Sequence, residues 1–195
     1  MVTQMGRNRT YEPDSALDNA MNLFWNKGFA GAHIQELVDV TGMNRFSIYQ
    51  QYGGKAGFFE AALSRYLEMA RQRYTTTLGS EPMGLRNVLQ YFSAIDFGKE
   101  YHGCFMINSL TEKSLIPQKA FRSAKAFLHE IETLYLENVE AAQMCGDLSK
   151  QIDGKSIAKI LFNFDLGLAI SGIVNQSDKG PSIVKTVSNI LSPLR

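Results

Sequence analysis

The sequence predicts an all-α protein in which a small helix-turn-helix domain precedes a larger helical bundle. Apolar residues recur at helical spacing along most of the chain, and no stretch alternates convincingly with the period of a β-strand. Two very short helical stretches, joined by a turn that contains Gly, lie near the N-terminus. The 195 residues are 45% hydrophobic, which suffices for a packed core, and the two cysteines exclude a disulfide scaffold.

The first predicted helix covers about residues 13–27 and has one apolar face. Pro13 suits the first turn of a helix, and Asp14 is favoured there by the positive end of the helix dipole. Gly28 stands where a left-handed C-terminal cap is expected, so that Phe29 can fold back onto the apolar face.

Two short helices follow. The first centres on Ile34–Val38 and ends at Thr41-Gly42. The second begins after Asn44, which is a good N-cap, and stops at Gly53-Gly54. Helices of about two turns are not stable alone, so both need the neighbouring helices as support.

The remaining chain predicts one long helix and then five further helices. The long helix runs from Lys55 to about residue 77, and the only clear organisational boundary lies inside it. Gly and Pro breaks separate the later helices, and Asp153 is a natural N-cap. Their expected ranges are 83–97, 103–115, 117–145, 153–176 and 181–192.

The second short helix has the character of a binding surface. Charge alone does not predict DNA binding, because the first 60 residues hold five basic and six acidic side chains. The helix is nonetheless polar over most of its circumference, and a polar helix among buried ones presents hydrogen-bonding groups to a partner. Lys55 begins the next helix, where free backbone N–H groups favour an anion such as a DNA phosphate. The alternative is two short helices that simply pack in an α-protein.

Three stretches carry a resemblance to a known family. The segments AMNLFWNKGF (residues 20–29) and TGMNRFSIYQQYGGK (residues 41–55) resemble the TetR family of one-component transcriptional repressors. The resemblance is specific over about residues 12–60. Further on, GCFMIN (residues 103–108) is similar to the Gly-Cys-apolar-Asn segment of a subgroup of this family.

The resemblance implies an all-helical homodimer of about nine helices per chain, which acts as a repressor released by a small-molecule or electrophile inducer. Residues 1–60 would form the DNA-binding domain, and residues 61–195 would bind the ligand and dimerise. Two recognition helices would enter successive major grooves about 34–36 Å apart, so the double-stranded operator should be approximately palindromic. Tyr49 and Lys55 match positions that contact phosphates. The residues that lie on the recognition helix are Asn44, Arg45, Ser47 and Gln50.

The sequence departs from the family pattern at two places. Phe46 stands where a small residue is common, so base contacts near it are displaced, or Phe46 touches a thymine methyl. Ala32-His33 replaces the usual Thr or Ser cap, which leaves the helix without a side-chain cap, and His33 could instead reach a phosphate. Before the first helix, Arg7 and Arg9 form either a solvated tail or an arm that contacts the DNA backbone or minor groove.

The C-terminal half is rich in aromatic residues, most of which should be core. Polar residues among them need partners, which could be another helix, the other subunit or a ligand; Asn163 and Asp165 are two such residues. An apolar pocket with few polar groups is the usual small-molecule site. The candidate ligand-binding residues are Phe105, Asn108, Phe127 and Phe164.

Cys104 follows Gly103 at the expected start of a helix, where the dipole lowers the pKa of a thiol. Two interpretations stay open: a buried small hydrophobe, or a sensor of oxidants and electrophiles. No metal site or cofactor is expected, because His33, His102 and His129 are scattered. No catalytic constellation indicates an enzyme.

The last two helices, about 153–176 and 181–192, are expected to pair with a second copy of the chain. The first of them is apolar nearly all round, with Gly167 and Gly172 allowing close approach, so it needs its own core and another subunit. Lys159, Asn163 and Asp165 interrupt its apolar run, which predicts a soluble, cytoplasmic protein rather than a membrane span. The alternative function is a helical protein that binds a small molecule but no DNA.

Overall fold

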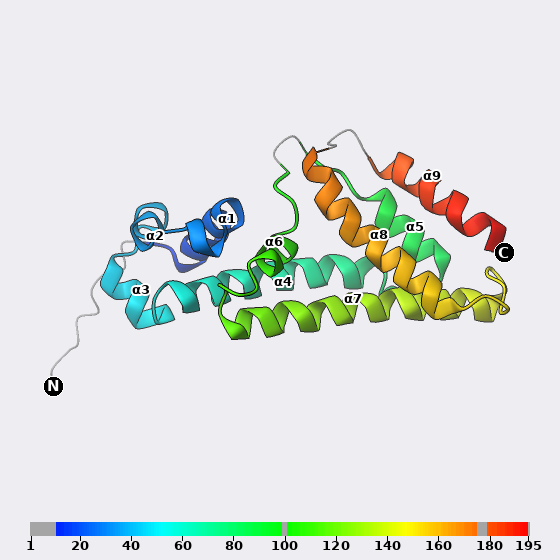
Figure 1. The fold of residues 1–195 in the computed structure, drawn as a ribbon, viewed down its shortest axis with the longest axis horizontal. Coiled ribbons are helices and arrows are strands. Elements are labelled where there is room, and N and C mark those ends of the chain that lie inside the picture. Colours follow the sequence, from blue (N-terminus) through cyan, green and yellow to red (C-terminus); the bar gives the residue numbers. More distant parts are fainter. Residues whose placement is uncertain (1–10, 99–100, 175–178, 195) are drawn as a thin grey trace. The chain divides into compact units, whose positions relative to one another are not determined.

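The computed structural model describes residues 11–98, 101–174 and 179–194, which form α-helices and a terminal 3-10 turn. The described part of the chain contains no β-strand, only an isolated bridge between Asp96 and Lys179. The all-α prediction is therefore confirmed (Figure 1). The helices are α1 Pro13–Gly31, α2 Ile34–Thr41, α3 Arg45–Tyr52, α4 Lys55–Thr77, α5 Leu85–Ser93, α6 Phe105–Thr111, α7 Gln118–Cys145, α8 Gly154–Val174 and α9 Gly180–Leu191.

The described residues fall into two compact units. The first holds residues 11–66 together with Asn108–Phe121, and the second holds Leu67–Ile107 and the described residues from Arg122 onward. Helices α4, α6 and α7 each contribute to both units. The first unit therefore contains the short helices and a segment from much later in the chain, which the sequence did not indicate.

The core of the first unit is aromatic. Phe24 of α1 and Phe59 of α4 are fully buried and meet edge to face, with ring centroids 5.1 Å apart. Phe29, just beyond the break in α1, packs on the same Phe59 ring at 5.0 Å, a contact with α4 that the sequence did not predict. Met43 and Ile48 complete the support of α3, since both are fully buried. These contacts supply the stability that two-turn helices lack on their own.

The core of the second unit is built from α5, α7, α8 and α9 with the last part of α4. Asn138 of α7 is fully buried, and both ends of its side-chain amide are hydrogen-bonded. The amide NH₂ donates to the carbonyls of Leu78 and Leu134, and the amide oxygen accepts the Gly84 N–H at 2.9 Å. The Asn138 side chain thus ties α7 to the connection between α4 and α5. Helix α9 packs against α5 (Figure 1).

Two predicted helices are shorter in the structure. The helix expected over 83–97 is α5, Leu85–Ser93; beyond it, Ile95 accepts the Gly180 N–H at 2.8 Å, so these residues pair with the start of α9 instead of continuing the helix. The helix expected over 103–115 is α6, Phe105–Thr111. Gly103 lies at φ +85° outside it.

Helix α8 is the one described helix with the length and hydropathy of a membrane span, but it also contributes core residues of the second unit, including Leu161 and Leu168. Asp153 is the N-cap of α8, as predicted, because its carboxylate accepts the Lys155 N–H at 3.1 Å. Of the two polar residues expected to be buried, Asp165 is buried, whereas Asn163 is exposed and donates to the Lys159 carbonyl.

Candidate functional site

Helix α3 presents an exposed surface that is polar and aromatic. Its one buried residue is Ile48, which faces the core of the first unit. Phe46 is 73% exposed and Tyr49 is 55% exposed, although both are large apolar residues that would be buried in a purely structural helix. Arg45 and Gln50 are exposed beside them. The structure thus brings four predicted DNA-binding residues onto one accessible helix.

The turn before α3 fixes the start of that helix. Gly42 ends α2 at φ 68°, a left-handed conformation that favours glycine. Asn44 is the N-cap of α3, as predicted, and its side-chain oxygen accepts the Ser47 N–H at 2.8 Å. Asn44 and Ser47 are therefore joined to each other, so their first role is to hold the helix end.

His33 is the N-cap of α2, and the cap interaction comes from Glu36 rather than from a Ser or Thr side chain. The Glu36 carboxylate accepts the His33 N–H at 2.9 Å, which is one half of a capping box. Glu36 also pairs with Lys27 of α1, and this hydrogen bond lowers the pKa of Glu36. The His33 residue is exposed, so its imidazole is accessible to a partner.

Lys55, predicted to contact phosphate, already has partners inside the first unit. Its ammonium lies 4.6 Å from the centroid of the Phe29 ring and donates to the Ala30 carbonyl at 3.4 Å. Burial lowers the pKa of Lys55, while the charges of Glu112 and Glu36 act in the opposite direction. The side chain is half-buried, so a phosphate would share it with the end of α1.

Glu112, which the sequence analysis missed, caps the end of α1. The backbone leaves helical geometry at Gly28, with φ 72° and ψ 174°, and then makes one further turn through Gly31. The φ of Gly28 is positive, as a left-handed cap requires, but its ψ lies outside the left-handed helical region, and α1 continues to Gly31 instead of ending near residue 27 as predicted. The Glu112 carboxylate accepts the N–H groups of Phe29 at 2.7 Å and Ala30 at 3.2 Å. The segment after α6 is thereby tied to the helix that supports Lys55.

Two further side chains near the end of α3 contact the first unit itself, and the predicted arginine arm is not described. Tyr52 stacks on Phe58 with ring centroids 4.1 Å apart, which places its ring in the packing of the first unit. Gln51 donates to the Tyr11 hydroxyl. Arg7 and Arg9 lie outside the described residues.

The predicted ligand-binding residues are divided between the two units. Phe105 and Phe127 are buried in the second unit, and Phe164 is half-buried with its ring 5.6 Å from that of Phe92. Asn108 belongs to the first unit. Phe127 alone among them lines a described pocket.

A buried carboxyl that contacts several tyrosines lies in the second unit. Asp165 of α8 accepts hydrogen bonds from the hydroxyl of Tyr74 at 2.8 Å and from that of Tyr91 at 3.0 Å. The Tyr135 hydroxyl lies near the same carboxyl, is buried, and has no hydrogen-bond partner of normal geometry among the described residues. Burial raises the pKa of Asp165, and the hydrogen bonds from Tyr74 and Tyr91 and the charge of Arg73 oppose that shift.

One pocket, of about 340 Å³, lies between α4 and α7 in the second unit. Its volume is in the range of small-molecule sites. Tyr74 is shared between this pocket and the Asp165 cluster, because it lines the pocket while its hydroxyl bonds Asp165. The lining residues are Arg71, Tyr74, Thr75, Phe127, His129, Glu130, Ile131, Thr133, Leu134 and Glu137.

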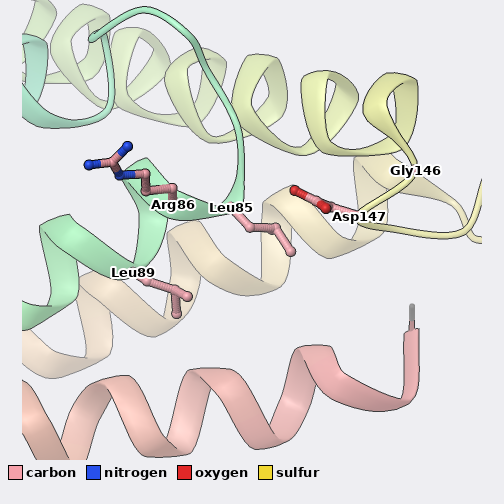
Figure 2. Close-up of a pocket in the computed structure, with 5 residues that line it drawn as sticks. All are labelled: Leu85, Arg86, Leu89, Gly146 and Asp147. Carbon is pink, nitrogen blue, oxygen red and sulfur yellow. The ribbon is translucent and has the colours of Figure 1, made fainter.

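A second pocket, of about 410 Å³, is lined by α5 and the connection between α7 and α8. Figure 2 shows Leu85 and Leu89 beside it, with the Arg86 guanidinium pointing away from the Asp147 carboxylate. It contains no aromatic residue and no converging polar groups, so it offers little to recognise a ligand.

The two cysteines differ in position. Cys104 is half-buried immediately before α6, whereas Cys145 ends α7 and is exposed. Helix α6, which begins directly after Cys104, has only seven residues, so the helix dipole at the thiol is that of a short helix. In the part of the chain that the structure describes, no three His, Cys, Asp or Glu side chains are grouped so as to hold a metal ion.

Comparisons with known proteins agree with this arrangement. Residues 16–62, which include α2 and α3, match the family described as bacterial regulatory proteins, tetR family. The chain is 35% identical over 114 residues to the HTH-type transcriptional repressor ComR of Escherichia coli, a match that covers 56% of this chain and 54% of that repressor. The alignment thus spans about half the length of that relative. It is 26% identical over 169 residues to the uncharacterized HTH-type transcriptional regulator YezE of Bacillus subtilis, covering 84% and 87% of the two chains.

Solved structures share the whole fold. A cysteine mutant of the TetR family transcriptional regulator CifR, complexed with a 26bp operator DNA, superposes with a TM-score of 0.75 at 22% identity, covering 97% of this chain and all of that one. The reduced form of E. coli NemR superposes with a TM-score of 0.76 at 20% identity, covering 90% and 94%. At these identities the likeness establishes the fold.

Proposed function

We propose that this chain is a member of the TetR family of bacterial regulatory proteins and a homodimeric transcriptional repressor that binds duplex DNA through α3. The observation that carries the proposal is the surface of α3, where Arg45, Phe46, Tyr49 and Gln50 are exposed on a helix that buries only Ile48. Two similar proteins support the proposal: ComR is a transcriptional repressor, and the CifR structure contains operator DNA. Residues 1–60 would form the DNA-binding domain and residues 61–195 the effector and dimer domain of a cytoplasmic protein.

Each exposed side chain of α3 has a chemistry that suits DNA. A guanidinium such as that of Arg45 pairs with guanine, a carboxamide such as that of Gln50 pairs with adenine, and an exposed ring such as Phe46 can cover a thymine methyl. Tyr49, His33 and Lys55 would contact phosphates, and Asn44 and Ser47 would hold the helix start against the groove. Phosphate contacts position the protein, whereas the base contacts select the operator.

The dimer would form through α8 and α9. Large apolar side chains remain exposed on these two helices, which is typical of a surface that a partner covers. Gly172 does not contribute as predicted: a Cβ at that position would lie 2.6 Å from the Phe97 ring of the same chain, whereas Gly167 faces open space. The exposed residues are Ile160, Ile170, Ile173, Val174 and Ile190.

Binding to DNA is tested with duplexes selected from a random pool, by fluorescence anisotropy at low salt. Arg45→Ala should weaken operator binding by about 1–3 kcal/mol and relax specificity at one position, since it loses a base contact. Tyr49→Phe should weaken binding without changing specificity. Lys55→Met should lower the slope of log affinity against log salt by about one, because one phosphate contact is lost.

Lys125→Ala is the matched control, because Lys125 is an exposed cation on α7 in the second unit. Its affinity and salt slope should equal those of the wild type. If the wild-type protein binds no duplex at low salt, the regulator proposal is wrong, and the alternative of a ligand-binding helical protein without DNA binding replaces it.

Release of the operator has two candidate triggers, a small-molecule ligand and modification of Cys104. The Cys104 side chain is half-buried, and the described NemR and CifR structures are a reduced form and a cysteine mutant. If the thiol is the trigger, Cys104→Ser should abolish release of DNA by N-ethylmaleimide while leaving affinity in its absence unchanged. Cys145→Ser, at the exposed cysteine, should respond like the wild type. If N-ethylmaleimide still releases DNA from Cys104→Ser, Cys104 is not the trigger and its role is packing.

A further inference from the structure

The last turn of α1 is held by a side chain from much later in the chain. The helix is broken at Gly28 and makes only one further turn through Gly31. A single turn is not stable alone, because it has too few backbone hydrogen bonds. The Glu112 carboxylate accepts the N–H groups of Phe29 at 2.7 Å and Ala30 at 3.2 Å. Hydrogen bonds to a charged acceptor are stronger than neutral ones, so Glu112 stabilises this turn.

The position of Glu112 is itself fixed by the backbone at the end of α6. Its N–H donates to the Ser109 carbonyl at 3.1 Å, and its carbonyl accepts the N–H groups of Leu115 at 2.8 Å and Ile116 at 3.1 Å. The Ile116 side chain is buried, which anchors the segment that follows α6. All of these residues belong to the first unit. The Glu112 carboxylate is therefore presented to α1 from a backbone that is hydrogen-bonded on both sides.

The same turn of α1 carries the Lys55 ammonium. The ammonium lies 4.6 Å from the centroid of the Phe29 ring and donates to the Ala30 carbonyl at 3.4 Å. Ala30 is thus bonded to Glu112 through its N–H and to Lys55 through its carbonyl. The charge of Glu112 also favours the charged form of the lysine, against the lowering of its pKa by burial. Glu112 acts on Lys55 both through the turn and through its charge.

We propose that Glu112 is a positioning residue for operator binding, which orients Lys55 toward a DNA phosphate by holding the last turn of α1. The inference rests on the proposed function, in which Lys55 contacts phosphate. A long side chain that is already held in place loses less conformational freedom when it binds. Charge alone predicts the opposite effect, because a carboxylate near the DNA repels phosphates and its removal would strengthen binding. The sign of the effect therefore separates the two explanations.

The test is a double-mutant cycle of operator affinity, measured by fluorescence anisotropy with the full-length protein and the selected duplex. Glu112→Ala should bind the operator about two- to tenfold more weakly than the wild type, because the Lys55 side chain must then be ordered on binding. In the Lys55→Met background the same substitution should cause no further loss, since the lysine to be positioned is absent. Glu112→Gln keeps an acceptor oxygen without the charge, so its affinity should lie between those of the wild type and Glu112→Ala.

Glu12→Ala is the charge-matched control. Glu12 is an exposed acidic residue of the first unit, and its side chain makes no cap hydrogen bond with α1. This variant should bind the operator at least as tightly as the wild type, because it loses only a negative charge. If Glu112→Ala also binds as tightly as the wild type or more tightly, or if it causes an equal loss in the Lys55→Met background, the proposal is wrong.

A second measurement needs no DNA. The ring current of Phe29 should displace the ε-methylene proton resonance of Lys55 upfield from that of the exposed Lys125, and Lys55→Met identifies the resonance. In Glu112→Ala the resonance should move to the Lys125 position, and in Glu112→Gln it should move part of the way. An unchanged resonance in both variants would overturn the proposal. Failure of the wild type to bind any duplex would refute the repressor proposal, whereas this resonance still decides whether Glu112 holds Lys55.

Discussion

Replacement of Gly28 by alanine should lower the free energy of unfolding by about 3 kcal/mol, because two separate costs fall on one residue. The backbone at Gly28 lies at φ 72° and ψ 174°, a region in which a side chain costs about 1–3 kcal/mol. A Cβ at this position would also lie 2.2 Å from a carboxylate oxygen of Glu112. That carboxylate would have to move, and the N–H groups of Phe29 and Ala30 would lose their charged acceptor.

The two costs of this substitution can be separated. Glu112→Gln keeps a side-chain oxygen but removes the charge, so it should cost about 1 kcal/mol, the lower end for hydrogen bonds to charged groups at a half-exposed site. Gly31→Ala is the control, because Gly31 is helical and its added Cβ would meet only Lys27 at 3.6 Å. That variant should be neutral or slightly more stable.

Urea unfolding of the wild type, the three single variants and the Gly28→Ala/Glu112→Gln double variant measures these differences. The loss in Gly28→Ala should exceed that in Glu112→Gln by the backbone cost, and the double variant should lose less than the sum, since both changes break the same contact. A Gly28→Ala protein as stable as Gly31→Ala would show that neither the backbone conformation nor the Glu112 cap contributes. Gly28→Ala should also bind DNA more weakly, because the Lys55 ammonium packs on the ring of Phe29, the residue next to Gly28.

The helices could be predicted because their determinants are local. Pro13, Asn44, Asp153 and the glycines at the ends of α2 and α3 each act on the few residues beside them, and the structure uses them as predicted. The exposure of α3 could be predicted because most of its circumference is polar, although the apolar Phe46 is exposed as well and leaves Ile48 alone to face the core. The predicted helix lengths were wrong where a distant segment contacts the chain. Beyond α5, for example, the Ile95 carbonyl accepts the Gly180 N–H instead of an N–H of the same helix.

The contacts that organise the sites could not be predicted, because they join residues far apart in sequence. Nothing beside Glu112 indicates that it caps a helix that ends more than 80 residues earlier. Asp165 was recognised as a polar residue in an apolar helix that needs a partner, yet its partners Tyr74 and Tyr91 lie on two other helices. Lys55 was expected to contact phosphate because it begins α4, where free backbone N–H groups favour an anion. Its packing on Phe29 depends instead on the end of α1, which is distant in sequence.

Asp165→Leu should destabilise the second unit by about 3 kcal/mol. The buried hydroxyls of Tyr74 and Tyr91 both donate to this carboxyl, and each buried donor left without an acceptor costs about 1–3 kcal/mol. Asp165→Asn should cost much less at low pH, because the amide has nearly the same volume and its oxygen still accepts one of these hydrogen bonds. Urea unfolding at pH 5 measures both effects.

The difference between the wild type and Asp165→Asn should depend on pH in a defined direction. The groups that face the carboxyl are Tyr74 and Arg73 from α4, Tyr91 from α5 and Tyr135 from α7. Burial raises the pKa of Asp165 above its ordinary 3.8, so the folded state keeps a proton that the unfolded chain has already released. Stability then falls as pH rises from the ordinary value to the raised one, and it is constant above it. Asp165→Asn lacks this loss, so it should gain relative to the wild type across that window.

Asp153→Asn provides a control of opposite sign. Asp153 is an exposed carboxylate at the start of α8, and its hydrogen bond from the Ser156 hydroxyl lowers its pKa below the ordinary value. Its contribution is therefore present above the ordinary pKa and lost as pH falls, so Asp153→Asn should lose stability relative to the wild type as pH rises through that range. Urea midpoints of the three proteins are compared from about pH 2.5 to about pH 8 in steps of about half a pH unit, because the Asp153 window lies below the ordinary pKa and the Asp165 window lies above it. If the two variants shift in the same direction, the folded protein does not hold Asp165 as a buried, proton-retaining carboxyl.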